Sequence, residues 1–314
     1  MKTGVPVLLL AVLLGPLAAP LFCAVETAQI VESKTDLLGL YRKPRHSRNY
    51  TLLKERGLRV LNLPEEERFA AVWKPEGYAS GRILVLLHGT GGSAYDGMKD
   101  ELALAEAYDL MLVGIQWHDE RTDVYDTGDK IYHRIDEVLR YLEKSDGVRP
   151  DKVALSGFSR GSAMSYEVTW LDLQSNRYFD LTISHSGGVH SDGVIAPLES
   201  SKPGVFLSKW LNGELGPTAF AGSHFFLYAG MKDEQWGTQM ADYIARARDL
   251  LKGSGGDVVE CIIDPNGTHM GYLRTPEYHE RSMKAFMKIL GESPEPVRAV
   301  RADSPKRVFA PRRR

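Results

Sequence analysis

The decisive stretch of this sequence is KVALSGFSRGSAMSYEVTWL, residues 152–171. It begins with a short apolar run, which is typical of a strand buried on both faces, and it ends with a helical pattern. Between them lies Gly157-Phe158-Ser159-Arg160-Gly161, the Gly-x-Ser-x-Gly pattern of a strand-to-helix turn that lifts a serine above a sheet. Only glycine avoids steric clashes at the two flanking positions of such a tight turn. The pattern therefore predicts that Ser159 is a nucleophile rather than part of an ordinary turn.

The sequence on both sides of this turn alternates between strand and helix patterns. Apolar runs typical of buried strands occur at residues 83–87, 110–115, 153–155, 181–183, 225–228 and 258–263. Helical periodicity occurs at residues 131–142, 240–251 and 276–290, and the last of these follows a Thr275 cap and begins with Pro276. This alternation predicts an α/β fold, with a mostly parallel central sheet and helices on both faces. We expect residues 52–53, 58–60 and 69–73 to add edge strands before the core.

A serine is a weak nucleophile at neutral pH unless a histidine accepts its proton and a carboxylate fixes the tautomer of that histidine. When the serine stands on a turn of this kind, the acid and then the histidine follow it along the chain, each after a later strand. Asp233 follows the strand pattern at 225–228, and His269 follows the one at 258–263. We therefore predict that Ser159, Asp233 and His269 are catalytic.

Other residues near these positions remain alternatives. Glu234 is adjacent to Asp233 and could be the acid, and Asp264 is a second alternative. His279 is an alternative base, but it lies inside the last helical pattern, where we expect a surface residue. His185 and His224 lie at the ends of strand patterns, where we expect packing or loop residues.

The charge that develops on a carbonyl oxygen during acyl transfer needs backbone N–H donors. One donor is the amide after the nucleophile, which belongs to Arg160. The other is expected from the loop His88-Gly89-Thr90-Gly91-Gly92 after the strand at 83–87, where Thr90 is our choice and Gly91 is the alternative. By their positions around this site, five residues are predicted to contact substrate: Gly89, Gly91, Trp117, His118 and Trp236.

Two of these segments also allow other interpretations. Residues 89–94 fit the Gly-x-Gly-x-x-Gly/Ala pattern of a dinucleotide site, but the strand at 110–115 is followed by Gln116 and not by the required acid, and Asp119 comes late. The polar residues of segment 118–126 could suggest a metal site, but the segment lacks a second histidine, so a solvated loop is favoured. We therefore expect neither a cofactor nor a metal ion. The polar residues are His118, Asp119, Glu120, Asp123 and Asp126.

The two ends of the chain do not follow the pattern of its body. Residues 1–23 combine Lys2, an apolar run and short residues near Cys23, which are features of a secretory signal peptide. We expect a secreted or periplasmic protein, with a lipoprotein anchor at Cys23 as the alternative. We interpret residues 24–49 as an N-terminal extension and residues 50–291 as the catalytic domain, in which residues 187–222 are a lid or insertion. Residues 292–314 are expected to be a disordered basic tail, either solvated or in contact with an anionic surface.

Composition excludes several classes of function. The 314 residues contain 39 Lys plus Arg against 41 Asp plus Glu, a net charge of −2, so no basic body is available to bind nucleic acid. Two cysteines cannot form a disulfide framework or a cysteine-rich zinc cluster. No segment after the signal-like region has the ~18 consecutive apolar residues of a membrane-spanning helix, so we expect no integral membrane span.

Four motifs together resemble the α/β-hydrolase superfamily over about residues 69–291: His-Gly-Thr-Gly-Gly at 88–92, Gly-Phe-Ser-Arg-Gly at 157–161, Gly-x-x-Asp at 230–233 and Gly-Thr-His at 267–269. Within it the chain resembles the secreted esterases grouped with polyhydroxybutyrate depolymerases and feruloyl esterases. It lacks the cysteine pairs and the substrate-binding domain of the depolymerases, so we expect a small-molecule or oligomeric ester rather than a polymer.

This resemblance implies the α/β-hydrolase fold, a triad of Ser159, Asp233 and His269, no cofactor, and transfer of an acyl group to water. A serine peptidase or acyltransferase on the same fold remains an alternative. So does a binding protein without catalytic activity.

Overall fold

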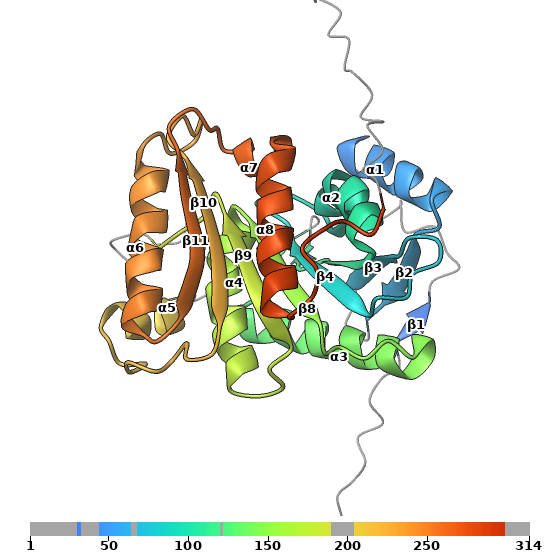
Figure 1. Cartoon of the computed structure of the whole chain (residues 1–314), viewed down its shortest axis with the longest axis horizontal. Helices are drawn as coiled ribbons and strands as arrows, with labels where there is room; N and C mark the ends of the chain where they lie inside the picture. The colour runs from blue at the N-terminus through green and yellow to red at the C-terminus, as the bar shows by residue number, and fades with distance from the viewer. Residues whose placement is uncertain (1–29, 33–43, 64–67, 120–121, 190–203, 299–314) are drawn as a thin grey trace, which may run out of the picture.

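The computed structural model describes residues 30–32, 44–63, 68–119, 122–189 and 204–298 (Figure 1). Its centre is a nine-stranded sheet with the order β1-β2-β3-β5-β4-β8-β9-β10-β11. These strands are β1 (Val31–Glu32), β2 (Arg59–Asn62), β3 (Phe69–Trp73), β4 (Arg82–Leu87), β5 (Leu110–Ile115), β8 (Val153–Phe158), β9 (Phe179–His185), β10 (His224–Gly230) and β11 (Asp257–Asp264). A short separate hairpin consists of β6 (His118–Asp119) and β7 (Val124–Tyr125).

The strands from β5 to β11 in this order run parallel, and β1, β2 and β3 add antiparallel pairs at one edge. The predicted mostly parallel sheet is therefore confirmed. From β4 the chain first moves outward to β5 and then returns to the other side of β4 as β8. Ligands bind open parallel sheets at such a reversal, beyond the carboxyl ends of the strands. The loops that follow β4 and β8 lie at this point.

Helices cover both faces of the sheet, as predicted. The alternating side chains of β4 show why its run is wholly apolar: Leu84 and Leu86 pack into one cluster with α1, α2 and α8, and Ile83, Val85 and Leu87 pack into another with α3 and α4. A third cluster joins α5 and α6 to β10. The helices are α1 (Pro44–Glu55), α2 (Ala94–Tyr108), α3 (Gly128–Asp146), α4 (Arg160–Leu173), α5 (Gly204–Leu211), α6 (Gln239–Gly253), α7 (Gly271–Arg274) and α8 (Pro276–Ile289).

The predicted edge strand at 52–53 is wrong, because these residues belong to helix α1. Tyr50 and Leu53, three positions apart on one side of the helix, are buried, whereas Leu52 is 36% exposed. Two adjacent leucines fit a strand as well as a helix, so their local sequence could not decide between them. The other two predicted edge strands correspond to β2 and β3.

The folded body extends beyond both ends of the predicted domain. At the start, β1 pairs with β2, and α1 begins at residue 44, ahead of the predicted domain start at residue 50. At the end, the amides of Val297 and Arg298 donate to the carbonyl of Ala107, and Glu292 contacts Arg82. The first seven residues of the predicted disordered tail are therefore held against the body. The predicted signal peptide, residues 1–23, and residues 299–314 lie outside the described residues.

The predicted lid or insertion at 187–222 is described in part, since residues 190–203 lie outside the described residues. Its helix α5 is packed into the third cluster. Trp210 is 2% exposed, its Nε1–H donates to Ser254 Oγ over 3.0 Å, and its ring lies 5.0 Å from that of Phe220. We conclude that this part of the segment is anchored to the core by its buried residues, which are Phe206, Leu207, Trp210, Ala219 and Phe220.

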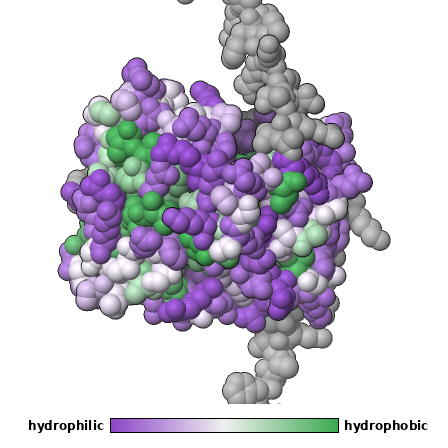
Figure 2. All heavy atoms as spheres, viewed as in Figure 1, coloured by the Kyte–Doolittle hydropathy of each residue, from purple (hydrophilic) through white to green (hydrophobic). Residues whose placement is uncertain are grey.

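The face of the molecule in Figure 2 is mostly hydrophilic, with apolar side chains gathered where Figure 1 places β10 and β11. This agrees with the position of β11 at the edge of the sheet, where Val259 is 37% exposed. Among the residues that the structure describes, no helix is both long and apolar enough to cross a membrane.

Candidate active site

Ser159 stands on a sharp turn between β8 and α4, as the Gly-x-Ser-x-Gly pattern predicts. Its φ of 54° and ψ of −115° are unfavourable for a residue with a side chain, and such strain is typical of functional positions. A Cβ atom on Gly157 would overlap the carbonyl of Gly161, and one on Gly161 would overlap the carbonyl of Leu87. Both flanking positions therefore require glycine for steric reasons.

The three residues predicted to be catalytic lie in one line of contacts. His269 Nε2 is 2.9 Å from Ser159 Oγ, and His269 Nδ1 is 2.5 Å from Asp233 Oδ2. The second carboxylate oxygen, Oδ1, accepts the amides of Gln235 and Trp236 at 2.8 and 2.9 Å. His269 and Asp233 are 5% and 4% exposed. The carboxylate thus holds Nδ1–H, which leaves Nε2 free to accept a proton from the serine.

Neither alternative acid reaches the imidazole of His269. The exposed Glu234 accepts the backbone N–H of His269 over 2.9 Å, and this hydrogen bond lowers the pKa of its carboxyl. Asp264 accepts the hydroxyl of Tyr278 over 2.8 Å and the amide of Asn266 over 2.9 Å. Glu234 therefore supports the backbone of the histidine loop and Asp264 helps to hold the turn at its start.

The expectation that His279 lies on the surface is wrong. It lies on α8, but it is 5% exposed, and its Nδ1 is 3.2 Å from Glu101 Oε2. Burial opposes the charged form of His279, but the carboxylate of Glu101, helped by Asp100 and the backbone of Tyr272, raises the pKa above its ordinary value. His279 thus belongs to a buried ion pair between α8 and α2.

His185 is buried and packed between aromatic rings, 4.3 Å from that of Tyr272 and 5.4 Å from that of Phe158. Burial lowers the pKa of His185 well below its ordinary value. This agrees with the expectation of a packing residue.

The two predicted oxyanion donors come from different elements. The amide of Arg160 is at the first position of α4, where backbone N–H groups have no partner within the helix and the helix dipole favours negative charge. In the loop after β4, the amide of Gly91 is already engaged, since it donates to Tyr125 Oη over 2.7 Å. Of the two alternatives, Thr90 is therefore the better second donor.

The prediction that Trp117 and His118 contact substrate is wrong. They are 0% and 2% exposed, because they pack against His88 in the loop that follows β4 and against Tyr125 of β7. The ring of Trp117 lies 5.1 Å from that of His88, and His118 stacks on Tyr125 at 4.0 Å. The half-buried Trp236 lies beside the acid, and its amide holds Asp233.

Two polar residues of segment 118–126, His118 and Asp126, are buried and paired within the protein. Asp126 accepts hydrogen bonds from both Arg68 and Arg134, and all three side chains are buried. His118 Nε2 lies 2.9 Å from Asp123 Oδ1. Glu120, also in this segment, lies outside the described residues. In the described ranges, no group of three or more His, Cys, Asp or Glu residues is arranged to hold a metal ion.

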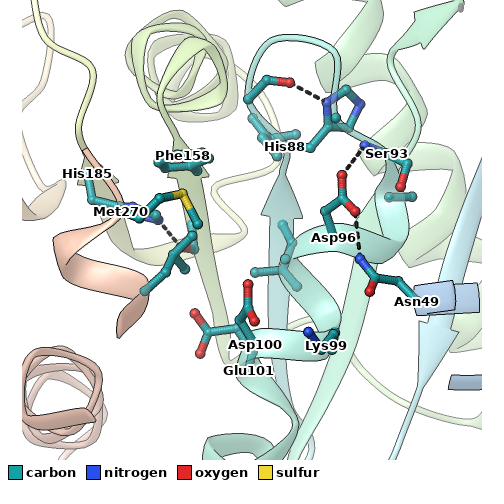
Figure 3. A pocket seen from close by; sticks show the side chains of 18 of the residues that line it. Asn49, His88, Ser93, Asp96, Lys99, Asp100, Glu101, Phe158, His185 and Met270 are labelled. Carbon is teal, nitrogen blue, oxygen red and sulfur yellow. Dashed lines mark hydrogen bonds between the residues drawn. The ribbon is translucent and has the colours of Figure 1, made fainter. Parts of the chain in front are cut away.

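A cavity of about 1010 Å³ opens beside the loop that follows β4 (Figure 3). Figure 3 shows Phe158, His185 and Met270 on one side of it and the α2 residues Lys99, Asp100 and Glu101 on another. Other lining residues include Leu52, Leu86, Leu87, Gly89, Thr90, Gly97, Ser156, Leu273 and Arg274.

Ser159 and His269 do not line this cavity, although their chain neighbours Phe158 and Met270 do. Gly89 lies between the cavity and Ser159, because it lines the cavity and a Cβ atom placed on it would lie 3.1 Å from Ser159 Cβ. Thr90 also belongs to the cavity wall. The space therefore begins where the predicted oxyanion donor lies and continues over the sheet between α2 and α7.

No family model matches this chain, and no curated protein matches it. Solved structures do. A fungal esterase structure from Rhizomucor miehei matches with a TM-score of 0.58 and 16% identity over 82% of this chain and 91% of the other. An esterase from Pyrobaculum calidifontis matches with a TM-score of 0.51 and 15% identity over 82% and 94%. An acylaminoacyl peptidase from Pyrococcus horikoshii matches with a TM-score of 0.53 and 16% identity over 77% of this chain and 43% of that one.

These matches are similarities of fold. Together with the sheet order and the turn at Ser159, they show that this chain has the α/β-hydrolase fold. The narrower resemblance to depolymerases and feruloyl esterases stays a prediction.

Proposed function

We propose that this chain is an exported serine hydrolase that cleaves carboxylic esters through an acyl-enzyme intermediate. The observation that carries the proposal is the contact line from Ser159 Oγ through His269 to Asp233, with distances of 2.9 and 2.5 Å, on a strained turn. A buried Asp–His pair could serve packing alone. Packing gives no reason for a serine to be held at positive φ against the free nitrogen of that histidine.

In the first half of the reaction, Ser159 Oγ attacks the ester carbonyl carbon while its proton passes to His269 Nε2. The amides of Thr90 and Arg160 stabilise the oxyanion. Asp233 stabilises the imidazolium and keeps its Nδ1–H oriented. The bond to the leaving alkoxide then breaks, the alkoxide takes the proton from Nε2, and the acyl group remains on Ser159.

In the second half, a water molecule takes the place of the alcohol. His269 Nε2 removes its proton as it attacks the acyl carbon, and the same two amides stabilise the second oxyanion. Protonation of Ser159 Oγ releases the carboxylic acid and restores the site. Every proton moves between the substrate, water and these side chains, so the mechanism requires no cofactor.

The residues that line the cavity indicate which part of the substrate it would hold. Its apolar residues Leu52, Leu86, Phe158, Met270 and Leu273 suit the carbon skeleton of an acyl group, and Gly89 connects it to Ser159. The proposed substrate is thus an ester of small or oligomeric size whose acyl group occupies this space. Export rests on the signal-like pattern of residues 1–23 alone.

The first experiment is labelling of the purified protein with a fluorophosphonate, followed by peptide mass analysis. We expect the reagent to label Ser159 in the wild-type protein and to leave Ser159→Ala unlabelled. The variant should also lose several orders of magnitude in turnover of p-nitrophenyl esters while it retains its unfolding temperature. Retained turnover in folded Ser159→Ala would refute the proposal. Faster turnover of peptide anilides than of esters would replace the esterase by a peptidase.

A further inference from the structure

One side chain touches both segments that supply the proposed oxyanion donors. Tyr125, at the end of the β6–β7 hairpin, accepts the amide of Gly91 on its hydroxyl over 2.7 Å. The guanidinium of Arg160 lies over the same ring, with Cζ 3.7 Å from the ring centroid. Gly91 is the neighbour of Thr90. Tyr125 therefore links the loop after β4 to the first residue of α4.

We propose that Tyr125 is a positioning residue that holds the amides of Thr90 and Arg160 at the spacing needed to bind one oxyanion. This inference rests on the proposed function. Backbone donors stabilise an oxyanion only if they are fixed in advance at hydrogen-bond distance from it. The loop after β4 is rich in glycine and has little stiffness of its own. The hydrogen bond from the Gly91 amide to Tyr125 fixes the peptide group between Thr90 and Gly91. It thereby restricts the orientation of Thr90, whose own amide is the proposed donor.

Tyr125 is held firmly enough for this role. Tyr125 is 6% exposed, and its ring stacks on His118 at 4.0 Å with an interplanar angle of 14°. The next residue, Asp126, is held by the buried Arg68 and Arg134, and its amide donates to the carbonyl of Trp117 over 2.8 Å. The buried charges of this segment thus have a purpose in the site, since they anchor the element that carries Tyr125.

Burial also keeps the tyrosine in the protonation state that this arrangement needs. It raises the pKa of Tyr125 above the ordinary value, although the Gly91 amide and Arg160 oppose the shift. The hydroxyl therefore remains neutral when the enzyme works near neutral pH. The contact between the Arg160 cation and the ring is a cation–π interaction, which is strengthened where water is excluded.

The test compares Tyr125→Phe with Tyr132→Phe. Tyr125→Phe retains the ring, its stacking and the cation over the ring. It removes the hydroxyl, which accepts the Gly91 amide and also hydrogen-bonds the Arg160 side chain. Tyr132→Phe is the matched control, because that hydroxyl, on α3, contacts Asp172 over 3.1 Å at the end of α4 opposite to Arg160. Removal of an oxyanion donor costs about 10²–10³ in kcat. A donor that is still present but poorly aligned should cost less. We therefore expect kcat to fall about 10- to 100-fold in Tyr125→Phe, with KM unchanged, and kcat to stay at the wild-type value in Tyr132→Phe.

A second measurement separates positioning from a general loss of structure. A trifluoromethyl ketone adds to Ser159 as a hemiketal, and NMR gives the pKa of that hemiketal. Weaker donors should raise this pKa in Tyr125→Phe and leave it unchanged in Tyr132→Phe. Arg160→Met retains the Arg160 amide but removes the cation over the ring. It should shift the hemiketal pKa in the same direction, which provides a test if Tyr125→Phe does not fold.

The outcomes distinguish the two proposals. If wild-type protein is not labelled by the fluorophosphonate, the proposed function fails. If wild type is labelled and Tyr125→Phe matches it in kcat and hemiketal pKa, only the inference about Tyr125 is overturned. A rise in KM at unchanged kcat would also overturn it, since it would indicate substrate binding rather than oxyanion stabilisation.

Discussion

Replacement of Asp233 by asparagine tests the acid of the proposed triad, and its effect follows from the hydrogen bonds of this carboxylate. Oδ1 accepts two backbone amides, from Gln235 and Trp236, so the oxygen of an asparagine would occupy that position. Its NH₂ group would then face His269 Nδ1, which must become an acceptor. The imidazole proton would move to Nε2 and point at Ser159. A histidine in this tautomer cannot accept the serine proton.

The expected loss is about 10⁴-fold in kcat, as the same change causes in a serine protease with this arrangement. This corresponds to about 5 kcal/mol of transition-state stabilisation. The assay is steady-state turnover of a small p-nitrophenyl ester, with thermal unfolding to verify the fold. KM should change little, because Asp233 is buried and does not line the cavity.

Glu234→Gln is the matched control. The exposed Glu234 accepts the backbone amide of His269, and a glutamine oxygen can still accept it. We expect less than about a threefold loss, since a surface hydrogen bond of this kind contributes little. If Glu234→Gln is the severe change and Asp233→Asn the mild one, the assigned acid is wrong. Two mild effects would place the acid elsewhere.

Three further predictions concern the turn, the cavity and the buried ion pair. The methyl group of Gly161→Ala would overlap a β4 carbonyl, so the free energy of unfolding in urea should fall by about 1–3 kcal/mol and turnover should also fall. Gly253→Ala, whose Cβ meets no atom within 4 Å, should cause no measurable loss of stability. Equal effects of the two changes would contradict the steric argument. Gly97→Leu should extend a side chain into the cavity. It should therefore lower kcat/KM for esters of bulky acids at least about tenfold more than kcat/KM for acetyl esters. Equal losses for both kinds of ester would show that the acyl group lies elsewhere. Glu101 raises the pKa of His279, so their pairing stabilises the fold below about pH 6.5, and this contribution is lost as the pH rises through the folded-state pKa. The difference in unfolding free energy between wild type and Glu101→Gln should therefore shrink from pH 6 to 9, and a constant difference would argue against the pairing.

Local sequence was sufficient for the parallel strands of the central sheet, for helices α3, α4, α6 and α8, and for the positions of the chemistry-bearing loops. A strand covered on both faces is apolar along its buried length, as residues 83–87 of β4 and all six residues of β5 are, and this signal is visible in five or six consecutive residues. The strained turn at Ser159 is equally local, because its flanking glycines are required by atoms of the turn and of the adjacent strand. Two leucines in α1 were ambiguous because so short a run has no period.

Tertiary structure alone decided how side chains from distant segments meet. It distinguished Asp233 from Glu234 by the direction in which each carboxylate points, and Thr90 from Gly91 by the tyrosine that occupies the Gly91 amide. It also buried His118 and His279, whose polar side chains were read as solvent-facing or substrate-facing. The physical reason is that periodicity reports the average environment of an element, whereas a hydrogen bond depends on the position and orientation of a partner that can lie a hundred residues away.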